Sequence, residues 1–306
     1  MQKDKITAYA LHICRSLIYG SSFLFTGHLL RSVEVLDVLA LRFLLSAAVM
    51  TLLSAVGVLK MSLDKEKIKA LLPVAFFEPV AYFLFETFGL TGISTSLAGL
   101  LGAMSPVVIV ILETLVLKER TTLLQKIFLG VAMVGVALIG ILSAAPGGQD
   151  TVWGILLFLG APISGGCFVI FSRKGSKRRC TALETTYFCA ISGAVVFNAI
   201  NVIRHLCNHS LTTYFQPLAD PQNLFGFFFL AVMSSVVATV FQNFALSKVQ
   251  ASSLSGLSGV STITSVLLGV LVNHEQLHWY HLLGGLCVLI GALGINYLSA
   301  KKIETA

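Results

Sequence analysis

Two glutamates and a tyrosine, Glu78, Tyr82 and Glu86, stand at steps of four in an apolar stretch. On a helix, residues four apart share a face, so these side chains would form a polar stripe. An ionisable group inside a membrane span costs about 2.5–3.5 kcal/mol on insertion scales and therefore needs a partner or a function. We predict that this face lines a cavity in which a carboxylate carries a proton or binds an amine. The alternative is a structural pairing with Arg15 or Arg42.

A second motif, His274-Glu275-Gln276-Leu277-His278, has the HExxH spacing. On a helix this spacing places two imidazoles side by side to hold zinc, with the glutamate as base. Here it falls at a hairpin expected between two apolar runs. Its counterpart in the internal repeat described below, Lys118-Glu119-Arg120-Thr121-Thr122, keeps the glutamate and lacks both histidines. We therefore predict that Glu119 and Glu275 are structural hairpin residues and expect neither metal nor cofactor; an intramembrane zinc hydrolase is the alternative.

Composition decides which elements must position these residues. Of 306 residues, 56% are hydrophobic and only 11% are charged, and the mean hydropathy is +0.88. So few charges cannot cover the water-exposed surface of a soluble protein. The chain is therefore expected to be an α-helical membrane protein.

Apolar runs long enough to cross a membrane recur along the whole chain. A spanning helix needs about 20 mainly apolar residues. We predict ten spans, at about 8–28, 36–58, 68–90, 95–117, 123–143, 151–172, 183–204, 224–246, 252–273 and 279–299. No Walker motif is present to drive transport with ATP.

The basic residues give the orientation. With ten spans and a cytoplasmic start, only Arg31 and Arg204 fall on the outer side of the membrane, and Arg15 and Arg42 lie within spans. The rest of the 21 Lys and Arg residues fall on the cytoplasmic side. This asymmetry follows the positive-inside rule, so both termini are expected in the cytoplasm and the protein in the plasma membrane. The net charge of +7 then reflects orientation, and no nucleic-acid partner is expected.

The chain also contains an internal repeat. Tyr19-Gly20-Ser21-Ser22-Phe23 aligns with Ser164-Gly165-Gly166-Cys167-Phe168. Further on, Phe85 aligns with Phe241 and Glu119 with Glu275. An odd number of spans per copy places the two copies in opposite orientations, an arrangement that many alternating-access transporters use.

The repeat adds residues to the candidate site. Glu86 aligns with Gln242, which stands beside Asn243, so both copies bring polar groups to matching positions. Arg15 shares a face with Tyr19 and either lines the same cavity or extends to the cytoplasmic surface. Arg42 lies close enough to the outer end of its helix to reach the surface, and we predict that it positions that helix.

The motifs together resemble the drug/metabolite transporter superfamily, in its EamA branch. The resemblance rests on Tyr19-Gly20-Ser21-Ser22-Phe23, on Leu41-Arg42-Phe43-Leu44-Leu45 and on the run from Ser105-Pro106 to Leu117-Lys118-Glu119-Arg120. In the second copy Asn273-His274-Glu275-Gln276-Leu277 stands before another Gly-rich helix, while Thr262 replaces Pro106.

The resemblance implies a ten-helix fold of two inverted five-helix repeats around a central cavity. We expect the first repeat at 1–145, the second at 151–300 and a cytoplasmic tail at 301–306. It also implies a secondary transporter, acting outward, of metabolites such as amino acids or of amphiphilic drugs, with possible proton coupling and a possible homodimer. A membrane sensor or scaffold that does not transport remains the other alternative.

Overall fold

The structure, a computed structural model, describes residues 2–57, 64–116, 118, 121–143, 150–175, 180–249, 257 and 259–304. Every regular element in these residues is helical. In chain order they are α1 (Gln2–Leu29), α2 (Val35–Ala55), α3 (Lys65–Ala75), the π-helix η1 (Phe76–Tyr82), α4 (Phe83–Gly89), α5 (Thr95–Gly102), α6 (Ser105–Val116), α7 (Leu123–Ser143), α8 (Val152–Gly175), α9 (Ala182–Cys207), the 3-10 helices η3 (Leu211–Thr213) and η4 (Gln216–Leu218), α10 (Pro221–Phe228), the π-helix η5 (Phe229–Val237), α11 (Ala238–Lys248), α13 (Gly259–Leu271) and α14 (Trp279–Glu304).

Seven stretches of the described chain are long and apolar enough to cross a membrane. They are Val35–Ala55, Lys65–Gly89, Thr95–Val116, Leu123–Leu142, Leu183–Cys207, Pro221–Gln242 and Trp279–Ser299. Val152–Phe168 and Gly259–Leu271 are shorter apolar helices. The predicted all-helical class is therefore confirmed, whereas the total of ten spans stays a prediction.

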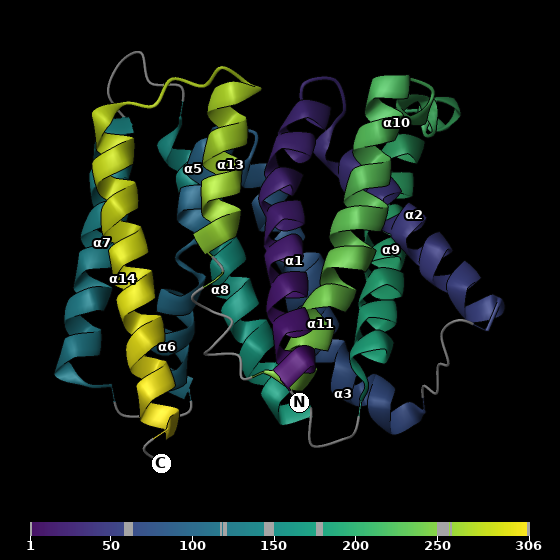
Figure 1. The fold of residues 1–306 in the computed structure, drawn as a ribbon. Helices are drawn as coiled ribbons and strands as arrows, with labels where there is room; N and C mark the ends of the chain where they lie inside the picture. Colours follow the sequence, from purple (N-terminus) through teal and green to yellow (C-terminus); the bar gives the residue numbers. More distant parts are fainter. Residues whose placement is uncertain are drawn as a thin grey trace.

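Most of the helices stand side by side along one direction, and α2 runs obliquely to them (Figure 1). α7 packs against α14 at one side of the bundle, and α2 packs against α9 at the other. Between these pairs α1 contacts α11 and α13, and α8 contacts α4 and α6. The first turn of α1 and the last turn of α14 lie at the same end (Figure 1).

Helix starts are fixed by side chains that accept hydrogen bonds from the otherwise unpaired first backbone amides. α9 begins with a capping box, in which Thr181 and Glu184 each accept from the other's backbone amide. The Nζ of Lys67 also donates to Glu184, at 2.7 Å, and so ties the start of α3 to the start of α9.

Two segments are wound as π-helices. Pro79 lacks the amide that would bond to the carbonyl of Ala75, which favours a kink in an α-helix. The structure instead has the π-helix η1 around Pro79. A second π-helix, η5, contains no proline and was not predicted. Since Phe85 aligns with Phe241, the two π-helices overlap when one repeat is laid on the other.

Small residues bring helices into direct backbone contact. A Cβ placed on Gly99 of α5 would collide with Ser265 of α13, and the hydroxyl of Thr262 donates to the Gly99 carbonyl at 3.1 Å. Between α7 and α14, a Cβ on Gly135 would lie 2.5 Å from the carbonyl oxygen of Gly284. Small residues thus allow close helix packing within one chain at both contacts.

Candidate functional site

Two tyrosines from different helices meet inside the bundle. The hydroxyls of Tyr19, on α1, and Tyr82, the last residue of η1, are hydrogen-bonded to each other. The guanidinium of Arg15 lies over the Tyr19 ring, 4.6 Å from its centroid. Arg15 therefore turns toward the predicted polar face, because a cation is attracted to the electron-rich face of an aromatic ring.

Both predicted carboxylates belong to this cluster. Glu86 is fully buried in α4, and its two carboxylate oxygens accept no hydrogen bond from the described residues. Glu78, partly buried in η1, interacts electrostatically with Arg15, and Glu86 interacts electrostatically with Arg42. Neither glutamate forms a direct ion pair with a described arginine. A buried carboxylate without a partner is costly when ionised, so its presence calls for a function.

The Arg42 side chain is buried inside the bundle and does not extend outward, while its role in positioning α2 stays a prediction. It is only 1% exposed. Its Nε donates to the hydroxyl of Ser235 at 3.2 Å and its Nη2 to that of Ser234 at 3.3 Å, both in η5. The guanidinium also lies 4.3 Å from the ring centroid of Phe83, in the first turn of α4. α2 packs against η5 and α4 at this position, so Arg42 faces inward.

The other predicted residues are less closely joined. Gln242 is partly buried in α11, and its side chain makes no hydrogen bond to the cluster among the described residues. The side chain of Asn243 lies outside those that the structure describes, and so does Glu119. Pro106 is the second residue of α6, where a missing amide costs no helical hydrogen bond. The helix break that precedes it, at 103–104, was not predicted.

The HExxH stretch is a loop and not a helix, and its glutamate caps another helix. The carboxylate of Glu275 accepts from the backbone amides of Thr95 and Ser96, at 2.8 and 2.9 Å. His274 and His278 are exposed. Among the described residues, no group of three or more His, Cys, Asp and Glu side chains stands close enough to hold a metal ion. A negative charge at the N-terminus of α5 is favourable, since the first amides there lack helical partners.

A second polar cluster, at the start of α2 and the end of α9, was not anticipated. Asp37 accepts from Asn201 at 2.8 Å and from Arg204 at 2.6 Å, and lies 2.9 Å from the Nε2 of His205. Arg204 also bonds to the exposed Glu34. No local spacing in the sequence could reveal this cluster, because its members come from helices of different halves of the chain.

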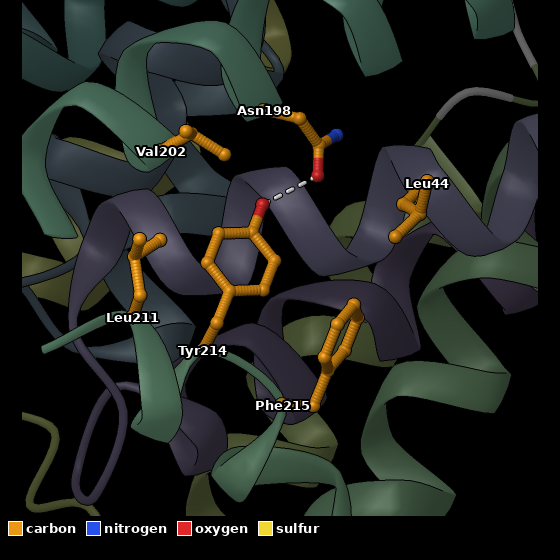
Figure 2. A pocket seen from close by; sticks show the side chains of 6 residues that line it. All are labelled: Leu44, Asn198, Val202, Leu211, Tyr214 and Phe215. Carbon is orange, nitrogen blue, oxygen red and sulfur yellow. Dashed lines mark hydrogen bonds between the residues drawn. The ribbon is translucent and has the colours of Figure 1, made fainter. Parts of the chain in front are cut away.

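An open cavity of about 320 Å³ lies beside this cluster, between α2, α9 and the segment 211–215 that follows α9 (Figure 2). The hydroxyl of Tyr214 donates to the Asn198 side chain at 2.6 Å, and burial raises the pKa of Tyr214. Apolar side chains form the rest of the lining: Leu44, Val202, Leu211 and Phe215. The cavity is separate from the Glu78 and Glu86 cluster, with which it shares no residue.

A bundle of long apolar helices with buried charged side chains at its centre defines an integral membrane protein with an internal polar site. The EamA-like transporter family matches residues 6–141 and 152–297. The chain therefore belongs to the EamA-like transporter family, as the resemblance predicted.

Similar proteins agree with this assignment. The chain is 35% identical over 304 residues to the uncharacterized transporter YcxC of Bacillus subtilis (strain 168), a match that covers 99% of this chain and 97% of the relative. A solved structure described only as "Crystal structure of protein" has a TM-score of 0.60, with 16% identity, 95% of this chain covered and 98% of the other. At that identity the likeness shows the fold alone.

Proposed function

We propose that this protein is a secondary transporter of small organic solutes in the plasma membrane, and that it works by alternating access around the cluster of Glu78, Tyr82 and Glu86. The observation that carries this proposal is the carboxylate of Glu86, which is fully buried without a hydrogen-bond partner among the described residues. Such a group, placed among membrane helices of a transporter family, suits a proton carrier or a binding site for an amine.

The proposed architecture is ten spans in two inverted repeats, 1–145 and 151–300, with a tail at 301–306. The packing of the helices supports it. α1 contacts α11 as its counterpart α8 contacts α4, and α2 contacts η5 as α9 contacts η1. Two copies that exchange equivalent contacts in this way can also exchange conformations, so that the central site opens to one side and then to the other.

The proposed orientation has both termini in the cytoplasm. It is supported by the basic residues, which gather in the connectors of one predicted side, and by the start of α1 and the end of α14, which lie at one end of the bundle (Figure 1). With that orientation the Asp37 cluster and the Glu275 loop face outward.

The mixed character of the site favours amphiphilic solutes. Tyr19, Tyr82 and Phe83 offer aromatic faces beside the two carboxylates. Organic cations and amines bind well to such a combination, because rings and carboxylates both attract positive charge. Gln242 and Asn243 would add amide groups from the second repeat. Export, proton coupling and assembly as a homodimer are part of the proposal.

Solute flux into proteoliposomes tests this function. A stabilisation screen of the purified protein against amino acids, nucleosides, polyamines and cationic dyes first identifies a binder, since a ligand of the folded state raises its stability. We expect transport of that binder to fall at least about tenfold in Glu78→Gln or Glu86→Gln, the loss of one essential charged contact. Glu113→Gln, a carboxylate change in α6 outside the cluster, is the matched control. Undiminished flux with both site glutamates replaced would refute the assignment.

A further inference from the structure

Arg42 and Glu86 approach each other from neighbouring helices, and each has polar atoms without a partner. The guanidinium of Arg42 lies over Phe83, which precedes Glu86 by three residues, so the two side chains share one face of α4. The Nη1 of Arg42 and both carboxylate oxygens of Glu86 are buried without hydrogen bonds among the described residues. A donor and an acceptor of opposite charge are thus unsatisfied on neighbouring helices, and the two groups interact electrostatically.

Among the described residues, the side-chain hydrogen bonds of Arg42 lead to the other repeat. Its Nε and Nη2 hold Ser235 and Ser234 of η5. The hydroxyl of Ser235 in turn donates to the carbonyl of Leu230, 2.9 Å away and within the same π-helix. Arg42 therefore contributes directly to the hydrogen bonding of η5.

We propose that Arg42 is a positioning residue that transmits the charge of Glu86 to η5. While Glu86 is neutral, the guanidinium stays on Ser234 and Ser235. When Glu86 loses its proton, the guanidinium turns its free Nη1 toward the carboxylate and releases the serines. This inference rests on the proton coupling included in the proposed function.

The energetics favour such an exchange of partners. Arginine keeps its charge throughout, so only Glu86 changes. An ionised carboxylate buried in an apolar bundle is strongly destabilised without a partner, whereas an ion pair is far stronger there than in water. A bond from the guanidinium to a serine hydroxyl is charged on the donor side alone, whereas a bond to an ionised carboxylate is charged on both sides and adds the Coulomb attraction of an ion pair.

Other groups near Glu86 set the background for this exchange. Glu78 and Tyr82 face it from η1 and Tyr19 from α1, while Arg42 approaches from α2. α8 also packs on α4, and there it brings Phe158 against Gly89 and Gly160 against Phe85, which are uncharged contacts. Arg42 is thus the positive group that can stabilise a negative charge on Glu86. A negative charge on Glu78 would destabilise it by repulsion.

Hydrogen exchange of η5 measures the transmission without a transported solute. In nanodiscs we compare peptides that cover 229–237 at about pH 5 and about pH 8, corrected for the intrinsic pH dependence of exchange. We expect exchange in the wild type to be about fivefold faster at the higher pH, because η5 loses its hold on Arg42. Glu86→Gln should keep the slow pattern at both pH values, and Arg42→Gln should abolish the difference. Glu113→Gln, the matched control, should behave as the wild type.

A second variant keeps the test valid if Arg42→Gln does not fold. Ser234→Ala combined with Ser235→Ala removes the two hydrogen bonds between Arg42 and η5. Hydrogen exchange in η5 should then be fast at both pH values. A wild-type pH difference that persists in Arg42→Gln or in the double serine variant overturns the proposal, as does a wild type without any difference.

The outcomes separate this inference from the proposed function. Solute flux that depends on Glu86, together with unchanged exchange in η5, removes only the role of Arg42. Exchange that follows Glu86 and Arg42, without solute flux under any gradient, removes only the transport assignment.

Discussion

Glu275 accepts two hydrogen bonds from Ser96, one from its backbone amide at 2.9 Å and one from its hydroxyl at 2.6 Å. The glutamate lies in the loop between α13 and α14, and the serine lies in the first turn of α5. The Glu275 carboxylate thus caps the N-terminus of α5, a helix of the other repeat. Because it belongs to an HExxH sequence, this contact also explains the motif without a metal.

Replacing Glu275 should destabilise the protein without affecting any metal content. In Glu275→Ala the first amides of α5 lose their acceptor, and we expect a loss of about 2 kcal/mol, measured as a lower melting temperature in detergent. Gln276→Ala, an exposed neighbour, should change little. Stoichiometric zinc in the purified wild type, removed by His274→Ala, would contradict this interpretation.

Two acids that bind Arg204 should differ greatly in their contribution to stability. Asp37→Asn weakens the acceptor of Asn201 and Arg204 in a largely buried cluster, and we expect a cost of about 3 kcal/mol, because a buried charge is left without its partner. Glu34→Gln should cost less than about 1 kcal/mol, since the Glu34 side chain is 76% exposed. Equal melting temperatures of the two variants would show that the cluster is not buried as described.

Two glycines of α7 should respond in opposite directions to the same change. Gly135→Ala places a methyl group 2.5 Å from the Gly284 carbonyl oxygen and should cost about 1–3 kcal/mol. Gly140→Ala meets nothing within 4 Å and should stabilise the helix by roughly 0.5–1 kcal/mol. Chemical or thermal denaturation of both variants in one detergent checks the sign. Tolerance of both substitutions would mean that α7 and α14 are not in backbone contact.

The inverted arrangement predicts that two equivalent loops lie on opposite sides of the membrane. In a variant without its native cysteines, Lys118→Cys should react with a membrane-impermeant maleimide only after the cells are opened. Gln276→Cys should react in intact cells. Both positions are exposed, so neither result depends on burial. Labelling of both from the same side would refute the inverted repeat.

The positions of the helices follow from the sequence, because a membrane span requires a long apolar run whatever its partners. The polar stripe of Glu78, Tyr82 and Glu86 was predictable for the same reason, since each residue is unusual in such a run. The π-helix η5 was not, because a wide turn without proline leaves no local signal. The structure shows that η5 overlaps η1 when one repeat is laid on the other.

Side-chain partners across the bundle were harder to predict. The sequence left open whether Arg42 extends to the surface, and Ser234 and Ser235 of a distant segment hold its side chain inside the bundle. Asp37 and Arg204 come together for the same reason, through packing of α2 on α9. Such pairs depend on how helices rotate about their axes, which a single sequence does not specify.

The contact between α7 and α14 limits how the rest of the molecule can rearrange. Where the Gly135 and Gly284 backbones touch, the two helices cannot slide along each other without collision. Each of these helices ends one sequence repeat, so their contact joins the two repeats at their last helices. Under the proposed alternating access, this contact restrains relative motion at the α7 and α14 edge, and we expect the largest displacements at the opposite edge, beside α2 and α9.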